Sequence, residues 1–255
     1  MSYTRVGESG RYIWCGGNYV NFGIEVVVDE DIDVFLYKLF KTRPDEFWQR
    51  YHHGSRIIEN YSGKKIGVYR YDRSTEDKMP VATVISEIAG EIWRDHFTPI
   101  IGEAQVEYML DKFQSAEQIC TDMDKNNFIY FIAKCEKSHS EGTPLGYCAV
   151  VPRDDHLFLS KMYVKNEHRG RGIAHSFLAE ADALCRLEYG LNKIRLVVNK
   201  HNSGVIAAYQ KMGFEIVDAV KADIGGGFFM DDYVMERYMT WPKSKEDEYA
   251  QKPTP

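Results

Sequence analysis

The chain has 255 residues, 44% of them hydrophobic, so it is long enough to bury one large core or two modest ones. Its formal net charge of −6 argues against nucleic acid as the main partner. No apolar run is long enough to cross a bilayer, and the first residues lack the apolar stretch of a signal peptide. We therefore expect a soluble, cytoplasmic protein without a nucleic-acid or membrane partner.

The five cysteines are odd in number and include no CxxC pair, which argues against a disulfide framework or a zinc site. We expect reduced, mostly buried thiols and no bound metal. The cysteines are Cys15, Cys120, Cys135, Cys148 and Cys185.

Residues 1–80 are interpreted as a small N-terminal α+β module of unknown role. Residues 11–28 look like a hairpin with glycines at the bend, and 63–71 read as a short strand. The segment between them begins with acidic residues suited to a helix start. Two uses of the module stay open, which are dimerisation and covering of a substrate site.

From Val81 onward the pattern is more regular. Helical spacing of apolar residues is followed by three strands, a helix, a strand, a short helix and a closing strand pair. This order predicts a mixed α/β class, a mixed sheet with helices covering it. The expected helices are 81–97, 102–113, about 171–189, and one from 202, and the expected strands are 127–135, 144–151, 156–164, 193–199, 213–223 and 225–239. The polar, Pro-rich residues 242–255 are expected to be a disordered tail.

A glycine turn lies between the strand at 156–164 and the helix that follows. The first turn of a helix has free backbone N–H groups and a partial positive charge. Gly170 and Gly172 would let that backbone approach a ligand, and Arg169 and Arg171 add positive charge. The turn therefore fits a phosphate site, although a plain strand-to-helix turn with strain-relieving glycines stays open.

A second motif, "NSGVIAAYQKMGF", follows the strand at 193–199. Asn202 and Ser203 are good helix-capping residues, and Gly213 fits a helix C-terminus.

Together the two motifs resemble the GCN5-related N-acetyltransferases, the GNAT family. "RGRGIA" is similar to the family's acetyl-CoA signature Q/R-x-x-G-x-G/A, met by Arg169, Gly172 and Ala174. "NSGVIAAYQKMGF" is similar to its second signature; Asn202, Tyr209, Lys211, Gly213 and Phe214 match, and Val205 stands where alanine is usual. The resemblance covers about Val81 to Met239 and implies a mostly antiparallel sheet in an acetyltransferase domain at 81–241.

The resemblance also implies roles for particular residues. Backbone groups of Met162, Tyr163 and Val164 would bind the pantetheine arm of acetyl-CoA, and Asn202 would face this co-substrate. The strands at 156–164 and 193–199 would splay apart to admit the thioester. Amides of the glycine turn would hold the pyrophosphate; these belong to Arg169, Gly170, Arg171, Gly172, Ile173 and Ala174.

Tyr209 matches the family's usual acid, which would protonate the leaving thiolate; an aromatic packed on the helix is the other interpretation. No general base can be named, because Ser160 and Lys161 stand where many members carry a carboxylate. Asp231 and Asp232 should point to opposite faces of a strand, so one of them either lines the acceptor pocket or belongs to an ordinary polar pair.

Trp93, His96 and Glu103 flank the connection between the first two helices, which often walls the acceptor site in this family. An aromatic beside carboxylates would suit a cationic amine, whereas a core tryptophan and exposed charges is the plainer interpretation. "IWRDHFTPIIGEAQVEYML" and "GGGFFMDDYVMERYM" look most like the PaiA-type branch, which is associated with polyamine acetylation.

The expected function is acetyl-CoA-dependent N-acetylation of a primary amine, such as the polyamine spermidine, by direct attack in a ternary complex. Two alternatives stay open: a non-catalytic acetyl-CoA-binding regulatory module, and an acetyltransferase of protein N-termini or lysines. A homodimer is compatible with each of these three functions.

Overall fold

The computed structural model describes residues 12–15, 18–21, 56–59, 65–135 and 142–239 of the chain. It divides the chain into two compact units, Met1–Ile58 with Met239–Pro255, and Glu59–Tyr238. Among the described residues, none of the helices combines the length and apolarity needed to cross a membrane.

In the first unit, β1 (Tyr12–Cys15) and β2 (Asn18–Asn21) pair antiparallel, from Tyr12 opposite Asn21 to Cys15 opposite Asn18. The expected hairpin is confirmed, although its glycine bend lies outside the described residues. β3 (Arg56–Glu59) is a strand whose Ile57 pairs with Tyr19. The sequence prediction did not separate this strand from the segment with a helical start, most of which lies outside the described residues.

The second unit contains a sheet of strands in the order β4-β5-β6-β7-β8-β10-β9. All neighbouring pairs are antiparallel except β7 and β8, which run parallel. The expected mixed, mostly antiparallel sheet is therefore confirmed. The strands are β4 (Lys65–Tyr71), β5 (Ile129–Cys135), β6 (Thr143–Pro152), β7 (Leu157–Val164), β8 (Lys193–Asn199), β9 (Glu215–Gly225) and β10 (Phe228–Tyr238).

β4 pairs with β5 from Ile66 opposite Cys135 to Tyr71 opposite Tyr130. The sequence analysis placed this strand in the N-terminal module, whereas the structure makes it part of the larger sheet. The division of the chain at residue 80 and the role of the preceding residues stay predictions.

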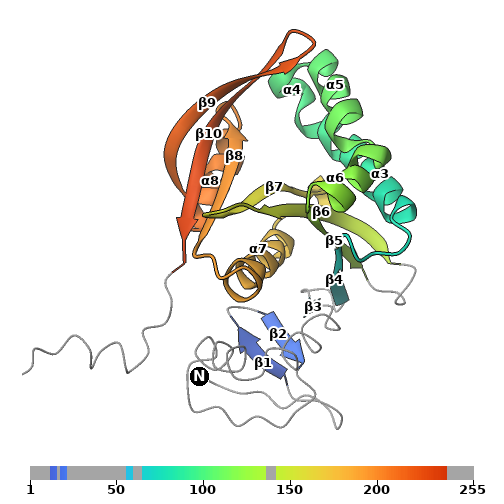
Figure 1. Cartoon of the computed structure of the whole chain (residues 1–255), viewed down its shortest axis with the longest axis vertical. Helices are drawn as coiled ribbons and strands as arrows, with labels where there is room; N and C mark the ends of the chain where they lie inside the picture. Colours follow the sequence, from blue (N-terminus) through green and yellow to red (C-terminus); the bar gives the residue numbers. More distant parts are fainter. Residues whose placement is uncertain (1–11, 16–17, 22–55, 60–64, 136–141, 240–255) are drawn as a thin grey trace, which may run out of the picture. The chain divides into compact units, whose positions relative to one another are not determined.

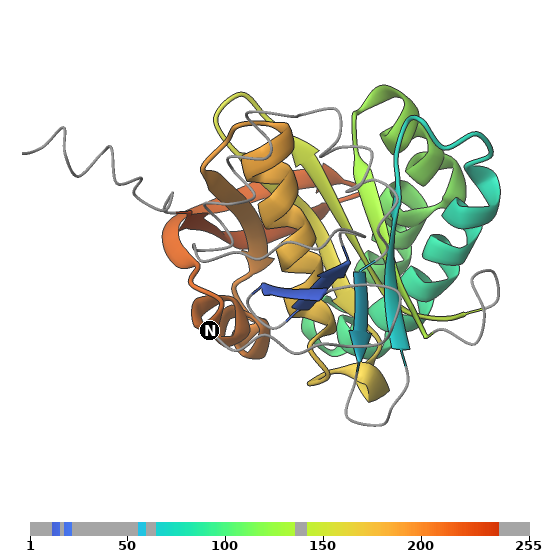
Figure 2. The ribbon, with the colours of Figure 1, turned by 90° about the horizontal axis from the view of Figure 1, so that it is seen from below.

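Helices cover both faces of β6 and β7: α3, α5 and α6 lie on one side, and α7 lies on the other (Figures 1 and 2). The helix expected at 171–189 is α7 followed by a π-helical turn, Leu184–Glu188. α6 was missed in the sequence. The helices are α3 (Met79–His96), α4 (Thr98–Ile101), α5 (Glu103–Gln114), α6 (Ala116–Lys125), α7 (Ile173–Ala183) and α8 (Ser203–Lys211).

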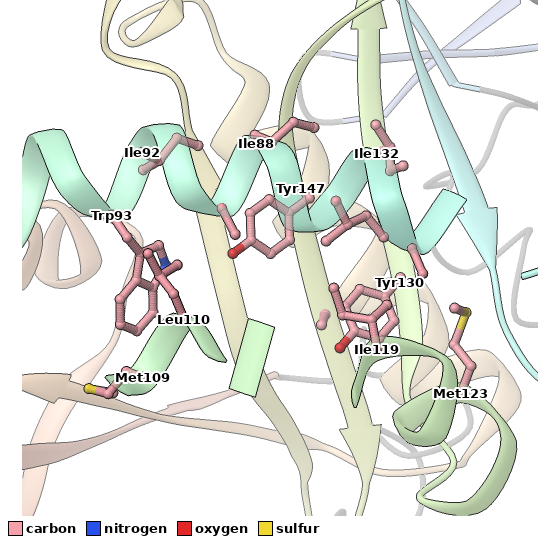
Figure 3. Close-up of a cluster of buried hydrophobic side chains, with 14 of the residues drawn as sticks. Ile88, Ile92, Trp93, Met109, Leu110, Ile119, Met123, Tyr130, Ile132 and Tyr147 are labelled. Atoms are coloured by element: carbon pink, nitrogen blue, oxygen red, sulfur yellow. The ribbon is translucent and has the colours of Figure 1, made fainter. Parts of the chain in front are cut away.

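Apolar side chains of α3, α5 and α6 pack on β5 and β6 in the main hydrophobic cluster (Figure 3). Ile85, Ile88 and Ile92 recur at helical spacing on α3, so one face of that helix is buried against the sheet. Trp93 continues the same face and is 4% exposed. It is therefore a packed side chain, as the plainer interpretation of the sequence held, although it also reaches the site described below.

α6 is attached to the sheet by a buried polar network. The ammonium group of Lys161 on β7 lies 3.2 Å from the Asp122 carboxylate of α6 and donates a hydrogen bond of 2.7 Å to the Tyr130 hydroxyl. Tyr130 in turn donates to Asp122 at 3.0 Å. Burial lowers the pKa of Lys161, and Asp122 opposes that shift. The network keeps a buried cation paired, so Lys161 is a structural residue of this face.

Four cysteines lie within the described part of the chain with their side chains, and all four are free thiols. Cys148 and Cys185 are buried, and Cys120 and Cys135 are partly exposed. Burial raises the pKa of the Cys185 thiol to about 12, so it stays protonated and packs as a core residue.

Candidate active site

β7 and β8 pair over three residues, from Leu157 opposite Ile194 to Leu159 opposite Leu196. Beyond this point β7 continues to Val164 and β8 to Asn199 without pairing to each other. Figure 1 shows β8, β9 and β10 turning away from β6 and β7. The separation agrees with the splay that the sequence resemblance implies, and it exposes one backbone edge of each strand.

A cavity of about 670 Å³ lies at this separation. Its walls come from the ends of β7 and β8, the start of α7, the inner side of α8, and the α3–α5 segment with β10. Many of the residues expected from the sequence line it together: Trp93, His96, Met162, Tyr163, Val164, Arg169, Gly170, Gly172, Ile173, Ala174, Asn202, Tyr209 and Asp232.

Three of the expected residues are not among those that line the cavity. Glu103 is exposed in the first turn of α5, and the Arg171 guanidinium donates to the Glu167 carbonyl at 2.9 Å. Asp231 forms an ion pair with Lys200 instead. The strand alternation expected for Asp231 and Asp232 is thus observed, and Asp232 is the one that faces the cavity.

The turn before α7 fits a bound anion. Gly170 and Gly172 have φ values of 72° and 82°, in the left-handed region that favours glycine. Among the described residues, the backbone N–H groups of residues 170–175 have no hydrogen-bond acceptor. Free amides at a helix N-terminus with Arg169 beside them suit a pyrophosphate, so the residues present fit coenzyme A.

Asn202 occupies the N-cap position of α8, but its side chain does not cap the helix. Its amide nitrogen lies 3.1 Å from Nε2 of His96 on α3, and Asn202 is 6% exposed. Burial and then the positive charge of Arg169 lower the pKa of His96, so this imidazole is neutral at pH 7. The pair joins α3 to α8 across the cavity, between residues that are distant in the sequence.

Tyr209 is buried, with its ring packed against Phe214 at a centroid distance of 5.6 Å. Burial raises the pKa of Tyr209, so its phenol keeps its proton at physiological pH. Burial also raises the pKa of Tyr163, and the neighbouring Tyr209 and Asp232 raise it further. Tyr163, Tyr209 and Asp232 all line the cavity at the point where β7 and β8 separate.

The hairpin of β9 and β10 is tied to α5, which completes the cavity wall. The Tyr108 hydroxyl donates to the Ile224 carbonyl at 2.7 Å, and Gln105 Nε2 donates to the Phe229 carbonyl at 2.9 Å. Sequence reasoning missed most of this wall, because its apolar members read as ordinary core residues. The lining residues that the sequence analysis did not assign to the site are Phe97, Ile101, Gln105, Met109, Leu159, Ser160, His168, His175, Val197, Val198, Asn199, Val205, Ala208, Met212 and Met230.

Residues 85–214, about half of the chain, match the model of the Acetyltransferase (GNAT) family. The chain therefore belongs to the GNAT acetyltransferase family. It is an N-acetyltransferase, and its co-substrate is acetyl-CoA. The acetyl-CoA signature at the glycine turn lies within the matched span.

Solved structures of the family share the fold. The PaiA N-acetyltransferase of Thermoplasma acidophilum in complex with coenzyme A is 21% identical, with a TM-score of 0.54 over 68% of this chain and 98% of that one. A GCN5-related N-acetyltransferase of Rhodopseudomonas palustris is 14% identical, with a TM-score of 0.53 over 68% and 94%. A GNAT-family acetyltransferase of Staphylococcus aureus is 17% identical, with a TM-score of 0.51 over 69% and 99%. None of the curated proteins compared matches the chain in sequence.

Proposed function

We propose that the chain transfers the acetyl group of acetyl-CoA to the nitrogen of a small primary amine, by direct attack within a ternary complex. One observation carries the proposal. A single cavity is lined by the glycine turn at Gly172, by Tyr209 and by the buried carboxylate of Asp232. Donor site, proton donor and a group suited to a cationic acceptor therefore share one space.

On the donor side, the free amides of residues 170–175 would hold the pyrophosphate. Backbone groups of Met162 and Tyr163 would bind the pantetheine arm along the edge of β7 that β8 leaves unpaired. An N–H of this edge would also stabilise negative charge that develops on the carbonyl oxygen. Asn202, which is oriented by His96, would face the same arm.

Tyr209 would act as the acid that protonates the departing sulfur. A protonated phenol at this position donates a hydrogen bond to the thiolate, and proton donation of this kind contributes roughly 10²–10⁴-fold to a rate. Because burial raises the pKa of Tyr209, the phenol is in the donating form throughout the neutral range. This is the role that the second signature implies for the residue.

Several acceptors fit this proposal at the level of a primary amine. A polyamine such as spermidine is the acceptor that the resemblance to the PaiA-type branch favours. The amino groups of protein N-termini or lysines form the second class, and a non-catalytic acetyl-CoA-binding module is the alternative without turnover. A cytoplasmic location and a homodimer stay predictions from the sequence.

The deciding experiment measures release of the coenzyme A thiol from acetyl-CoA with a panel of amines. The panel contains aliphatic and arylalkyl monoamines, spermidine, and peptides with free N-termini or lysines. Amine-dependent thiol release with formation of the N-acetylated product supports the proposal. Tight binding of acetyl-CoA with no release for any amine would refute it and favour the regulatory module.

A further inference from the structure

Asp232 is a buried carboxylate without a protein partner. It lies on β10 opposite Asn199 of β8, lines the cavity, and is 3% exposed. Among the described residues, no side chain or backbone group donates a hydrogen bond to it and no cation pairs with it. The adjacent Asp231 points to the other face and is satisfied by Lys200. A buried acceptor aimed into a cavity and left unsatisfied by the protein is typical of a site that a ligand completes.

The surroundings of Asp232 are apolar. Met230 lies two residues before Asp232 on β10, and together with Ile101 and Phe97 it packs against the buried cluster that contains Met109 and Trp93. All five side chains are among those that line the cavity. Asp232 is the one carboxylate among the lining residues of the described chain, and the guanidinium of Arg169 belongs to the glycine turn. Beside Asp232 the cavity therefore offers one negative charge and a largely apolar wall.

The charged and titratable neighbours keep Asp232 able to accept a proton. Burial raises its pKa to about 6, the adjacent Asp231 raises it too, and Lys200 opposes the change. Tyr163, Tyr209 and His96 also border this cavity, and the pKa shifts of these residues keep all three neutral at pH 7. A base whose pKa lies near the working pH is largely ionised at that pH, and it still has enough affinity for a proton to take one from the substrate.

We infer that Asp232 binds the ammonium group of the acceptor and takes its proton, and that the acceptor is a monocationic primary amine with an apolar body. This inference rests on the proposed function and narrows its acceptor. A second cation, as in spermidine, would enter the apolar part of the cavity without a counter-charge, and burying an unpaired charge is strongly unfavourable.

The proton and electron balance is complete without a further reactant. Asp232 takes one proton from the ammonium, which leaves a neutral amine with a free electron pair. That pair forms the C–N bond to the thioester carbonyl carbon, and the C–S bond breaks with its electrons going to sulfur. Tyr209 gives its proton to the sulfur. After the C–N bond has formed, the nitrogen loses a second proton, which restores the phenol of Tyr209. Asp232 returns its proton to solvent, so each turnover releases one proton.

The first test replaces Asp232 by Asn and uses Asp231→Asn as the matched control. We expect Asp232→Asn to lower kcat/KM for the amine about 100-fold at pH 7.5 and to keep the affinity for acetyl-CoA, as measured by calorimetry. In the wild type the rate should fall as the pH drops through about 6, because protonated Asp232 cannot accept a proton. In the variant the break near pH 6 should disappear, and the rate should instead rise with pH up to the pKa of the amine, where the amine deprotonates unaided.

Asp231→Asn should stay within about threefold of the wild type at pH 7.5. Its acidic limb should move to lower pH, because Asp231 helps to raise the pKa of Asp232. Equal losses in the two variants, or an unchanged pH profile in Asp232→Asn, would overturn the role of Asp232.

The second test compares hexylamine and 2-phenylethylamine with spermidine. We expect kcat/KM to be at least about tenfold higher for the monoamines. Faster turnover of spermidine would overturn the inference about the acceptor and leave the proposed function standing. Absence of thiol release with every amine would refute the proposed function, and with it this inference.

Discussion

Replacement of Gly172 by glutamate tests whether the turn before α7 binds the pyrophosphate. Gly172 has φ 82° and ψ −2°, and no heavy atom lies within 4 Å of a Cβ placed on it. A Cβ at this position therefore meets no steric obstacle, but the left-handed backbone costs an L residue roughly 1–2 kcal/mol. In a unit of this size that lowers the Tm by roughly 2–8 °C.

The effect on binding should be larger than the effect on stability. A glutamate at the first turn of α7 places a negative charge where the free amides of residues 170–175 would meet the pyrophosphate. Like charges held together cost several kcal/mol, so we expect acetyl-CoA to bind at least about 100-fold more weakly in calorimetry.

Gly190 provides the matched control for this variant. It has φ 63°, equally open space around its Cβ, and no place among the residues that line the cavity. Gly190→Glu should therefore lose a similar amount of stability and bind acetyl-CoA normally. Unaltered binding in Gly172→Glu, or an equal loss of affinity in both variants, would refute the assignment of the turn.

Three further predictions concern Tyr209, Asp122 and Asp232. Tyr209→Phe should bind acetyl-CoA as the wild type does and release coenzyme A roughly 100-fold more slowly; turnover unchanged across the pH range would contradict its role as the acid. Asp122→Ala removes the buried partner of Lys161 and should lower the free energy of unfolding by about 3–5 kcal/mol in urea titrations; a loss below about 1 kcal/mol would show that the network is not stabilising. Because folding raises the pKa of Asp232 to about 6, the folded state binds its proton more tightly, so stability falls as the pH rises from about 4 to 6. Asp232→Asn should accordingly unfold at a higher urea concentration at pH 7, with the difference shrinking toward pH 4, whereas a variant less stable than the wild type at pH 7 would refute this reasoning.

The sequence predicts the sheet of the larger unit well, because its strands and helices have clear apolar periods and its glycine turn carries a recognisable signature. α6 was missed because its ten residues, AEQICTDMDK, are mostly polar. Besides the apolar contacts of Ile119 and Met123, its attachment uses the contact of Asp122 with Lys161 on a distant strand. That contact is a product of tertiary packing, which local propensity does not encode.

The proposed donor half of the site is visible in the sequence because it lies in two compact motifs, one around residues 162–174 and one around 202–214, whereas the proposed acceptor half is assembled from distant segments. Strand alternation predicts that Asp231 and Asp232 face opposite ways, but it does not say which face borders the cavity. In the sequence, Met109 and Met230 have the pattern of core residues. In the structure, both line the cavity that lies where β7 and β8 separate. His96 and Asn202 meet across 106 residues, so no local pattern indicates their contact.

The short parallel junction between β7 and β8 also affects the mechanics of the molecule. With pairing limited to Leu157–Leu159 and Ile194–Leu196, two blocks of strands, β4–β7 and β8–β10, share a narrow seam. A co-substrate bound between the two blocks would contact both of them and hold them together. Because a ligand that binds only the folded state raises its stability by mass action, the bound co-substrate would stabilise this junction. The free energy needed to open this seam, measured by amide hydrogen exchange, would then increase with the concentration of acetyl-CoA. The enzyme would therefore resist unfolding best when its co-substrate is abundant.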